Sequence, residues 1–153
     1  MKKPRILVVS AKNALRYVLG HLPIPGVTEY PDKTDHYAAI SIQDAAGGGF
    51  GFELRESRYC NGVLTLYFDD TDEPCEGLTL MDETQARQII DFIQEHRDVD
   101  TLLIHCFAGV SRSRAVGVFA GELLGVQVTE EKCYNEHVYS ILKKVWRDYY
   151  ENS

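Results

Sequence analysis

Two consecutive apolar segments constrain the fold of this chain more than any other feature. Residues 101–105 (TLLIH) have an unbroken apolar interior, and residues 114–124 (RAVGVFAGELL) are apolar nearly all round. The first pattern predicts a strand that is buried on both faces, and the second predicts a helix in the centre of a fold. A buried strand that leads into a buried helix is typical of α/β proteins whose parallel sheet is covered on both sides.

The rest of the chain alternates between strand and helix patterns. The strand patterns are 5–9, 37–42 and 63–68; the helix patterns are 11–19, a segment that begins at Asp82, and a segment that follows an N-cap at Thr129. A length of 153 residues favours one domain. We therefore predict an α/β fold in a single domain over residues 1–153, with a central, mostly parallel sheet of about four to five strands flanked by helices.

Local signals mark several boundaries. Asp82 and Gln85 have the spacing of a capping box, and Glu130 and Glu131 place negative charge in the turn after the Thr129 N-cap. The glycine run at 47–49 is not followed by Lys-Ser/Thr, so it predicts a flexible loop and not a phosphate-binding one. The last helix has one apolar stripe, which we interpret as core packing; it consists of Val138, Ile141, Leu142, Val145, Trp146 and Tyr149.

Composition excludes several classes of function. The formal net charge of −7 disfavours a nucleic-acid or membrane-surface partner. No segment approaches the ~18 apolar residues of a membrane span, and the apolar run after Lys2 and Lys3 is too short for a signal peptide. The four cysteines lack zinc-finger spacing. We expect a cytoplasmic monomer with free thiols that needs no metal or other cofactor.

The segment HCFAGVSRS (105–113) joins the predicted buried strand to the predicted buried helix. A loop in this position directs its backbone N–H groups into one concavity, and the helix N-terminus behind it adds roughly half a positive charge. Such a loop binds a dianion even in an acidic protein.

The side chains of this loop point to covalent chemistry. The helix terminus and Arg112 would lower the pKa of Cys106 and make it a thiolate, which is a nucleophile. Arg112 offers a planar fork of donors for two oxygens, and Gly109 lets the backbone turn tightly. Ser113 can donate a hydrogen bond to the sulfur, and His105 would orient the loop. Taken singly, Cys106 also fits a small buried hydrophobe and His105 a core histidine, but their combination favours catalysis.

The run HCFAGVSRS resembles the signature loop of the cysteine-based protein tyrosine phosphatases, His-Cys-x5-Arg-Ser/Thr. More narrowly, it resembles their dual-specificity branch and its small bacterial and phage members. The resemblance extends over residues 60–124, whereas residues 1–55 share the order of elements alone. It implies a protein tyrosine phosphatase-like fold with Cys106 as nucleophile. It also implies a phosphate site made by the loop residues Phe107, Ala108, Gly109, Val110, Ser111 and Arg112.

The resemblance further requires a general acid, an aspartate on a separate loop upstream. The segment LYFDDTDEP (66–74) contains three aspartates, and the family pattern maps onto Asp70, with Asp72 as the second choice and Asp69 as the third. In extended backbone Asp69 and Asp70 point to opposite faces, so one of the two can face the pocket. On their own, the three carboxylates would also fit a solvated turn.

The resemblance implies hydrolysis of a phosphate ester in two steps, through a phosphocysteine on Cys106 and with Asp70 as acid and then base. The loop interior lacks lysine, which favours phosphoprotein or aryl phosphate substrates over phosphoinositides. We expect phosphotyrosine as the substrate, and phosphoserine and phosphothreonine as well if the pocket is shallow. Arg114, which follows the signature, is interpreted as structural.

Two other functions stay open on the sequence. One is a catalytically weak phosphatase-like module that binds phosphorylated partners. The other is sulfur transfer or arsenate reduction on a similar loop, which would not need Asp70. A protective disulfide between oxidised Cys106 and one of Cys60, Cys75 and Cys133 also fits the sequence.

Overall fold

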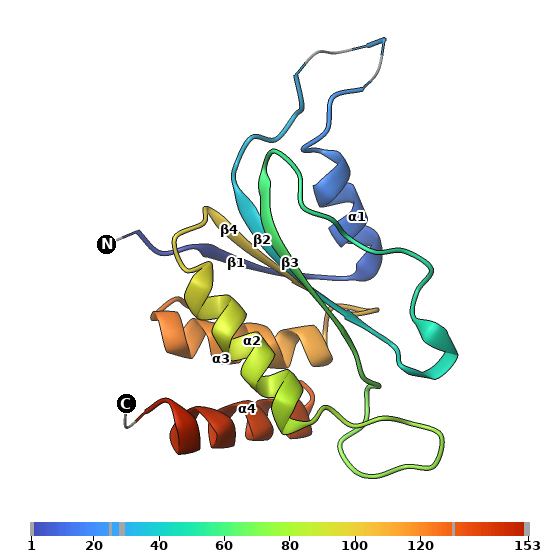
Figure 1. Cartoon of the computed structure of the whole chain (residues 1–153), viewed down its shortest axis with the longest axis vertical. Coiled ribbons are helices and arrows are strands. Elements are labelled where there is room, and N and C mark those ends of the chain that lie inside the picture. Colours follow the sequence, from blue (N-terminus) through green and yellow to red (C-terminus); the bar gives the residue numbers. More distant parts are fainter. Residues whose placement is uncertain (1, 25, 28–29, 130, 152–153) are drawn as a thin grey trace.

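The structure is a computed structural model that describes residues 2–24, 26–27, 30–129 and 131–151. In this part of the chain four parallel strands form one sheet in the order β1-β4-β2-β3 (Figure 1). The strands are β1 (Arg5–Val9), β2 (Tyr37–Gln43), β3 (Cys60–Tyr67) and β4 (Thr101–His105). β2 and β4 lie inside the sheet and are buried at every residue, as strands covered on both faces must be.

Helices cover both faces of the sheet. α1 (Ala11–Leu19) packs on one face through Ala14 and Tyr17. α2 (Glu83–Glu95), α3 (Arg112–Leu124) and α4 (Glu136–Tyr149) form a layer on the other face, with α3 against β1 and β4 (Figure 1). The predicted α/β class is confirmed, and the sheet has four strands, all parallel. Among the described residues, no helix is both long and apolar enough to cross a membrane.

Most of the local predictions agree with the structure. The capping box of α2 is present, since the Asp82 carboxylate accepts from Gln85 N–H at 2.8 Å and the Gln85 side chain accepts from Asp82 N–H at 3.2 Å. The glycine run 47–49, for which the sequence predicts a flexible loop, lies in and just after a short 3-10 helix, η1 (Ala46–Gly48). The apolar stripe of α4 packs into the core except at Tyr149, which is 49% exposed and lies against the guanidinium of Arg87.

The predicted N-cap at Thr129 is wrong. The N-cap of α4 is Asn135, whose Oδ1 accepts from Val138 N–H at 2.9 Å. The Thr129 hydroxyl accepts instead from Glu131 N–H at 3.0 Å. The helix begins later because Asn135 is buried and holds tertiary contacts as well, which outweigh the local preference of a threonine followed by acidic residues. Glu130 lies outside the described residues.

The parallel sheet determines where a ligand site can lie. Because every strand runs in the same direction, the carboxyl ends of all four meet at one edge. The chain leaves that edge at Ser10, Asp44, Phe68 and Cys106. Ligands of open parallel sheets bind at this edge, so the topology gathers distant segments of the sequence around Cys106.

A polar cluster around Asp35 lies at the other end of the strands, where β4 begins. Asp35 accepts hydrogen bonds from His21 Nε2 at 2.8 Å, from the Thr101 hydroxyl at 2.8 Å and from the Tyr17 hydroxyl. Burial by itself would raise the pKa of Asp35, but the hydrogen bonds from Tyr17, Thr101 and His21 outweigh it and lower the pKa to about 2. The cluster joins α1 and the segment before β2 to the start of β4.

We expect Asp35→Asn to lower the free energy of unfolding near neutral pH by about 2 kcal/mol, from the size of the pKa change. The folded-state pKa lies below the unfolded-state value, so this contribution is complete above about pH 5 and is lost as the pH falls towards about 2. Urea unfolding of both proteins at several pH values measures it. A difference that persists unchanged at low pH would contradict the assignment, and Asp32→Asn, at an exposed position nearby, is the control.

Candidate active site

The loop between β4 and α3 turns tightly against the end of β1. Gly109 has a φ of +80°, and a Cβ at this position would lie 2.5 Å from both the Ser10 nitrogen and the Val9 carbonyl carbon. The Ala11 N–H, at the start of α1, donates to the Phe107 carbonyl oxygen at 3.0 Å. Glycine is therefore required at position 109. The hydrogen bond from Ala11 fastens the loop to the junction of β1 and α1.

Cys106 lies beneath this loop at the end of β4 and is 2% exposed. Its Sγ lies 3.1 Å from the Ser113 hydroxyl and accepts from Gly109 N–H at 3.3 Å. Burial by itself would raise the pKa of the thiol, but the hydrogen bonds from Ser113 and Gly109 and the charge of Arg112 outweigh it and lower the pKa. Cys106 therefore ionises at lower pH than an ordinary cysteine, and the thiolate that results is the nucleophilic form.

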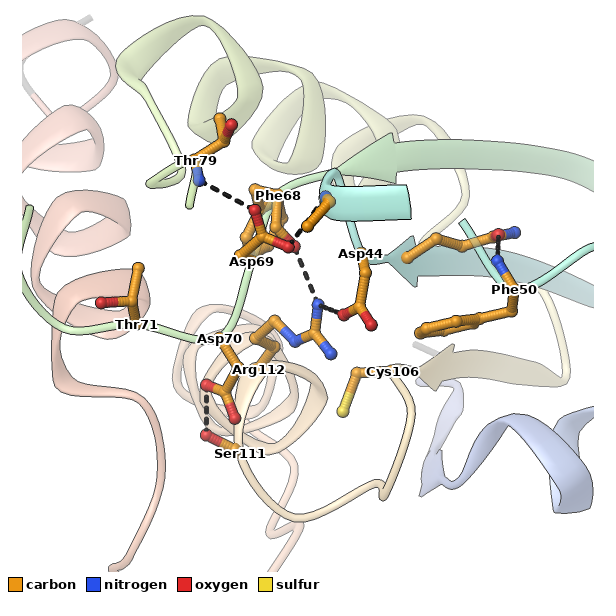
Figure 2. A network of polar contacts seen from close by, with 12 residues as sticks. Asp44, Phe50, Phe68, Asp69, Asp70, Thr71, Thr79, Cys106, Ser111 and Arg112 are labelled. Atoms are coloured by element: carbon orange, nitrogen blue, oxygen red, sulfur yellow. Dashed lines mark hydrogen bonds and ion pairs between the residues drawn. The ribbon is translucent and has the colours of Figure 1, made fainter. Parts of the chain in front are cut away.

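The guanidinium of Arg112 is anchored through one nitrogen. Nη1 donates to the Phe68 carbonyl oxygen at 2.8 Å and to Asp44 Oδ1 at 2.7 Å (Figure 2). Nε is buried and has no hydrogen-bond partner among the described residues. Because an unpaired buried donor is costly, this side of the guanidinium is suited to bind oxygens of an anion placed over Cys106.

His105 links the end of β4 to the base of the loop. Its Nε2 lies 2.6 Å from the Ser41 hydroxyl on the neighbouring strand β2, and its Nδ1 lies 2.9 Å from the Cys106 carbonyl oxygen. The ring also stacks on Phe52, with ring centroids 5.7 Å apart. Burial lowers the pKa of His105, so a neutral ring donates from Nδ1 to the carbonyl and accepts at Nε2 from the serine. The structure thus places His105 in a positioning role.

Asp69, the third choice for the general acid, is hydrogen-bonded to backbone N–H groups. Its carboxylate accepts from Ala46 N–H at 3.1 Å and from Thr79 N–H at 2.8 Å (Figure 2). Burial by itself would raise the pKa of Asp69, but these N–H groups and the charge of Arg112 lower it. Asp69 therefore holds two loops together and is a poor proton donor.

Asp70 and Asp72 make different contacts at the start of α4. Asp70 Oδ1 accepts from the Ser111 hydroxyl at 2.7 Å, which Figure 2 shows, and from Asn135 Nδ2 at 2.8 Å. Asp72 Oδ1 accepts from Glu136 N–H, in the first turn of α4, at 3.1 Å. Of the three aspartates, Asp70 is the one whose carboxylate contacts a side chain of the loop that contains Cys106.

The other loop residues form the mouth of the site. Phe107, Ala108 and Val110 are exposed, and Ser111 is partly buried. Arg114 Nη1 donates to the Cys133 carbonyl oxygen at 3.0 Å, in agreement with the structural role predicted for it.

The remaining cysteines are free thiols. Cys60 packs in the core on the α1 face of the sheet, whereas Cys106 belongs to the core on the other face, so the sheet separates the two. Cys75 and Cys133 are exposed. A disulfide from Cys106 to Cys60 therefore does not fit this arrangement.

Sequence reasoning missed three residues of the site. Asp44, which pairs with Arg112, follows a strand directly and so lies at the ligand-binding edge; that position was a usable signal. Asn135 precedes a glutamate and an apolar period, which is an N-cap signal. Ser41 gave no signal, because its contact with His105 depends on the pairing of β2 with β4.

Comparison with known proteins assigns this chain to no family, so its function has to be inferred from the geometry of the site. Neither a scan against protein-family models nor a search of curated proteins found a match. Within the described ranges, no three or more His, Cys, Asp and Glu side chains are grouped as metal ligands would be.

The lowered pKa of Cys106 can be measured directly. We expect iodoacetamide to modify Cys106 with a rate that reaches its plateau at lower pH than for an ordinary thiol. Ser113→Ala removes a hydrogen bond to the sulfur and should move this inflection to higher pH. Peptide mass spectrometry of samples quenched between about pH 5 and about pH 9 gives both curves. Cys75 and Cys133 are internal controls, and an inflection that Ser113→Ala leaves in place would contradict the assignment.

Proposed function

We propose that this chain is a cysteine-dependent phosphatase of the protein tyrosine phosphatase superfamily, on its dual-specificity-like branch. It hydrolyses phosphotyrosine esters, and phosphoserine and phosphothreonine esters as far as the mouth of the site admits them. One observation carries the proposal: Cys106, a thiol whose pKa the charge of Arg112 helps to lower, shares a loop with this guanidinium, whose buried Nε has no partner among the described residues. A phosphoryl dianion would satisfy that donor and the N–H groups of the loop together.

In the first step the Cys106 thiolate attacks phosphorus in line with the ester oxygen. The S–P bond forms while the P–O ester bond breaks, and Asp70, protonated in the substrate complex, gives its proton to the departing oxygen. The Nε edge of Arg112 and the loop N–H groups donate hydrogen bonds to the remaining phosphoryl oxygens. These donors are already in place before the reaction, so they stabilise the negative charge on the oxygens throughout the step. Asp44 contributes through its ion pair with Nη1, which keeps the guanidinium of Arg112 from rotating out of the site.

In the second step water cleaves the phosphocysteine. Asp70, now a carboxylate, takes a proton from water as the new O–P bond forms, and the S–P bond breaks to release inorganic phosphate. The Ser113 hydroxyl, 3.1 Å from the sulfur, stabilises the thiolate that departs. The cycle returns Cys106 and Asp70 to their starting states.

The position of Asp70 favours catalysis over a phosphate-binding module. A carboxylate held against the loop by Ser111 and Asn135 would repel a bound dianion, which is useful in a proton donor but costly in a receptor. Sulfur transfer and arsenate reduction gain no support, because they do not need this aspartate. Since the nucleophile works as a reduced thiolate, we also propose that the protein acts in the cytoplasm.

Turnover of two aryl phosphates by four proteins tests this proposal. We expect wild type to hydrolyse phenyl phosphate and para-nitrophenyl phosphate in the presence of a chelator, and Cys106→Ser to be inactive. Asp70→Asn should lower kcat for phenyl phosphate by about a hundredfold, because this leaving group needs a proton. The loss should be smaller for para-nitrophenyl phosphate, whose leaving group is a weaker base.

Asp72→Asn is the matched control, because it removes a carboxylate of the same loop that binds a backbone N–H and not the catalytic loop. It should keep most of the activity with both substrates. Activity that persists in Cys106→Ser would exclude the mechanism. A large loss in Asp72→Asn with none in Asp70→Asn would assign the acid to Asp72. Binding of phosphopeptides by an inert wild type would favour the module.

A further inference from the structure

β3 is the last strand of the sheet, so one of its sides has no neighbouring strand in the described part of the chain (Figure 1). One hydrogen bond fixes the direction of its backbone groups, since Phe68 N–H, directly after the strand, donates to the Gln43 carbonyl oxygen of β2 at 3.1 Å. Successive residues of a strand direct these groups to opposite sides, and the register with β2 is unbroken from Gly62 to Tyr67. The residues whose N–H and C=O groups point outward are therefore Val63, Thr65 and Tyr67.

Most of these outward groups are unpaired. The Tyr67 carbonyl oxygen accepts from Gln85 Nε2 of α2 at 3.1 Å, which agrees with its outward direction. The Tyr67 N–H and both backbone groups of Val63 and Thr65 have no hydrogen-bond partner among the described residues. A row of unpaired N–H and C=O groups is a template on which another strand can pair.

The side chains of β3 do not protect this edge. Natural edge strands are commonly protected by charged residues or proline. The edge strand at the other side of the sheet has both, since residues 2–5 (KKPR) lead into β1 and its first residue is exposed. β3 (CNGVLTLY) contains no charged residue and no proline. Three successive residues of β3 are only half-buried, which leaves apolar surface on both faces of the edge; they are Val63, Leu64 and Thr65.

We propose that β3 is an interface at which two copies of this chain join their sheets, with the two β3 strands antiparallel around a two-fold axis at Leu64. Val63 of each copy then lies opposite Thr65 of the other, and each such pair exchanges both of its N–H···O hydrogen bonds. Leu64 meets its own copy at the axis, in a pair without hydrogen bonds, where side chains lie closest. Tyr67 keeps its contact with Gln85 in this register.

Charge favours a second copy in this orientation. The segment before β3, 55–58 (RESR), has a net positive charge, and the segment after it, 69–73 (DDTDE), is acidic. Antiparallel pairing brings the basic end of one strand towards the acidic end of the other, whereas parallel pairing would bring the acidic ends together. The strands themselves are uncharged, so no like charges oppose each other across the pair.

The proposed contact is closed. A two-fold contact uses the β3 edge of both copies, and the remaining edges are the β1 strands with their basic residues, so association stops at the dimer. This inference does not depend on the proposed phosphatase activity, and it replaces the monomer that we expect from the sequence.

Sedimentation velocity of the full chain between about 1 µM and about 1 mM tests the interface, because contacts of small area associate weakly. We expect wild type to pass from monomer to dimer within this range. Thr65→Lys places two cations within about 8 Å of each other across the axis and should raise the dissociation constant by about tenfold or more. Asn13→Lys adds the same charge at an exposed position on α1 and is the control, with an unchanged dissociation constant expected.

Amide hydrogen exchange followed by NMR locates the contact without a variant. The amides of Leu64 and Leu66 bond to β2 in the single chain, so they should exchange slowly at every concentration. The amides of the outward residues should exchange fast in the monomer and more slowly as the dimer forms; they are Val63, Thr65 and Tyr67. The alternation of fast and slow amides along β3 should therefore fade as the protein concentration rises.

Each result decides the proposal. A monomer at every concentration would overturn it. A dimer that forms equally well in folded Thr65→Lys protein would also overturn it, and so would a dimer in which the outward amides of β3 still exchange fast. If Thr65→Lys does not fold, the exchange pattern of wild type decides by itself.

Discussion

The organisation of the site depends on how the buried guanidinium of Arg112 is held. A buried charge needs partners, and Arg112 finds them at the ends of two other strands, in the carbonyl oxygen of Phe68 after β3 and the carboxylate of Asp44 after β2. Both contacts use Nη1. The interaction that ties α3 to the sheet edge therefore leaves Nε without a hydrogen-bond partner among the described residues, and the proposed anion site depends on the same guanidinium that packs α3 against the sheet.

The same edge explains how a chain of net charge −7 can hold an anion site. Three carboxylates surround the guanidinium, and each has a separate set of partners. Asp69 is bound by backbone N–H groups, Asp44 by Arg112, and Asp70 by the side chains of Ser111 and Asn135. In the proposed function the phosphoryl group would meet the N–H donors of the loop and of helix α3, with Asp70 as the carboxylate beside the loop. Local arrangement and not net charge decides what the site attracts.

The sequence predicted the parts of the fold that short-range patterns determine. The strand at 101–105 and the capping box at Asp82 were correct because burial on every side and a reciprocal side-chain cap leave few alternatives. The helix start at Thr129 failed because local preference favoured it while Asn135 had tertiary partners, among them Asp70. Ser41 meets His105 through the pairing of β2 with β4, which no single segment of the sequence contains.

The central claim is that Cys106 forms a covalent bond to phosphorus. Mass spectrometry of Asp70→Asn protein, acid-quenched during turnover of para-nitrophenyl phosphate, tests it most directly, because loss of the base slows breakdown of the intermediate. The account predicts a phosphoryl group on the peptide that contains Cys106, and its absence in Cys106→Ser. Turnover without any phosphorylated peptide, or with phosphate on another residue, would contradict it.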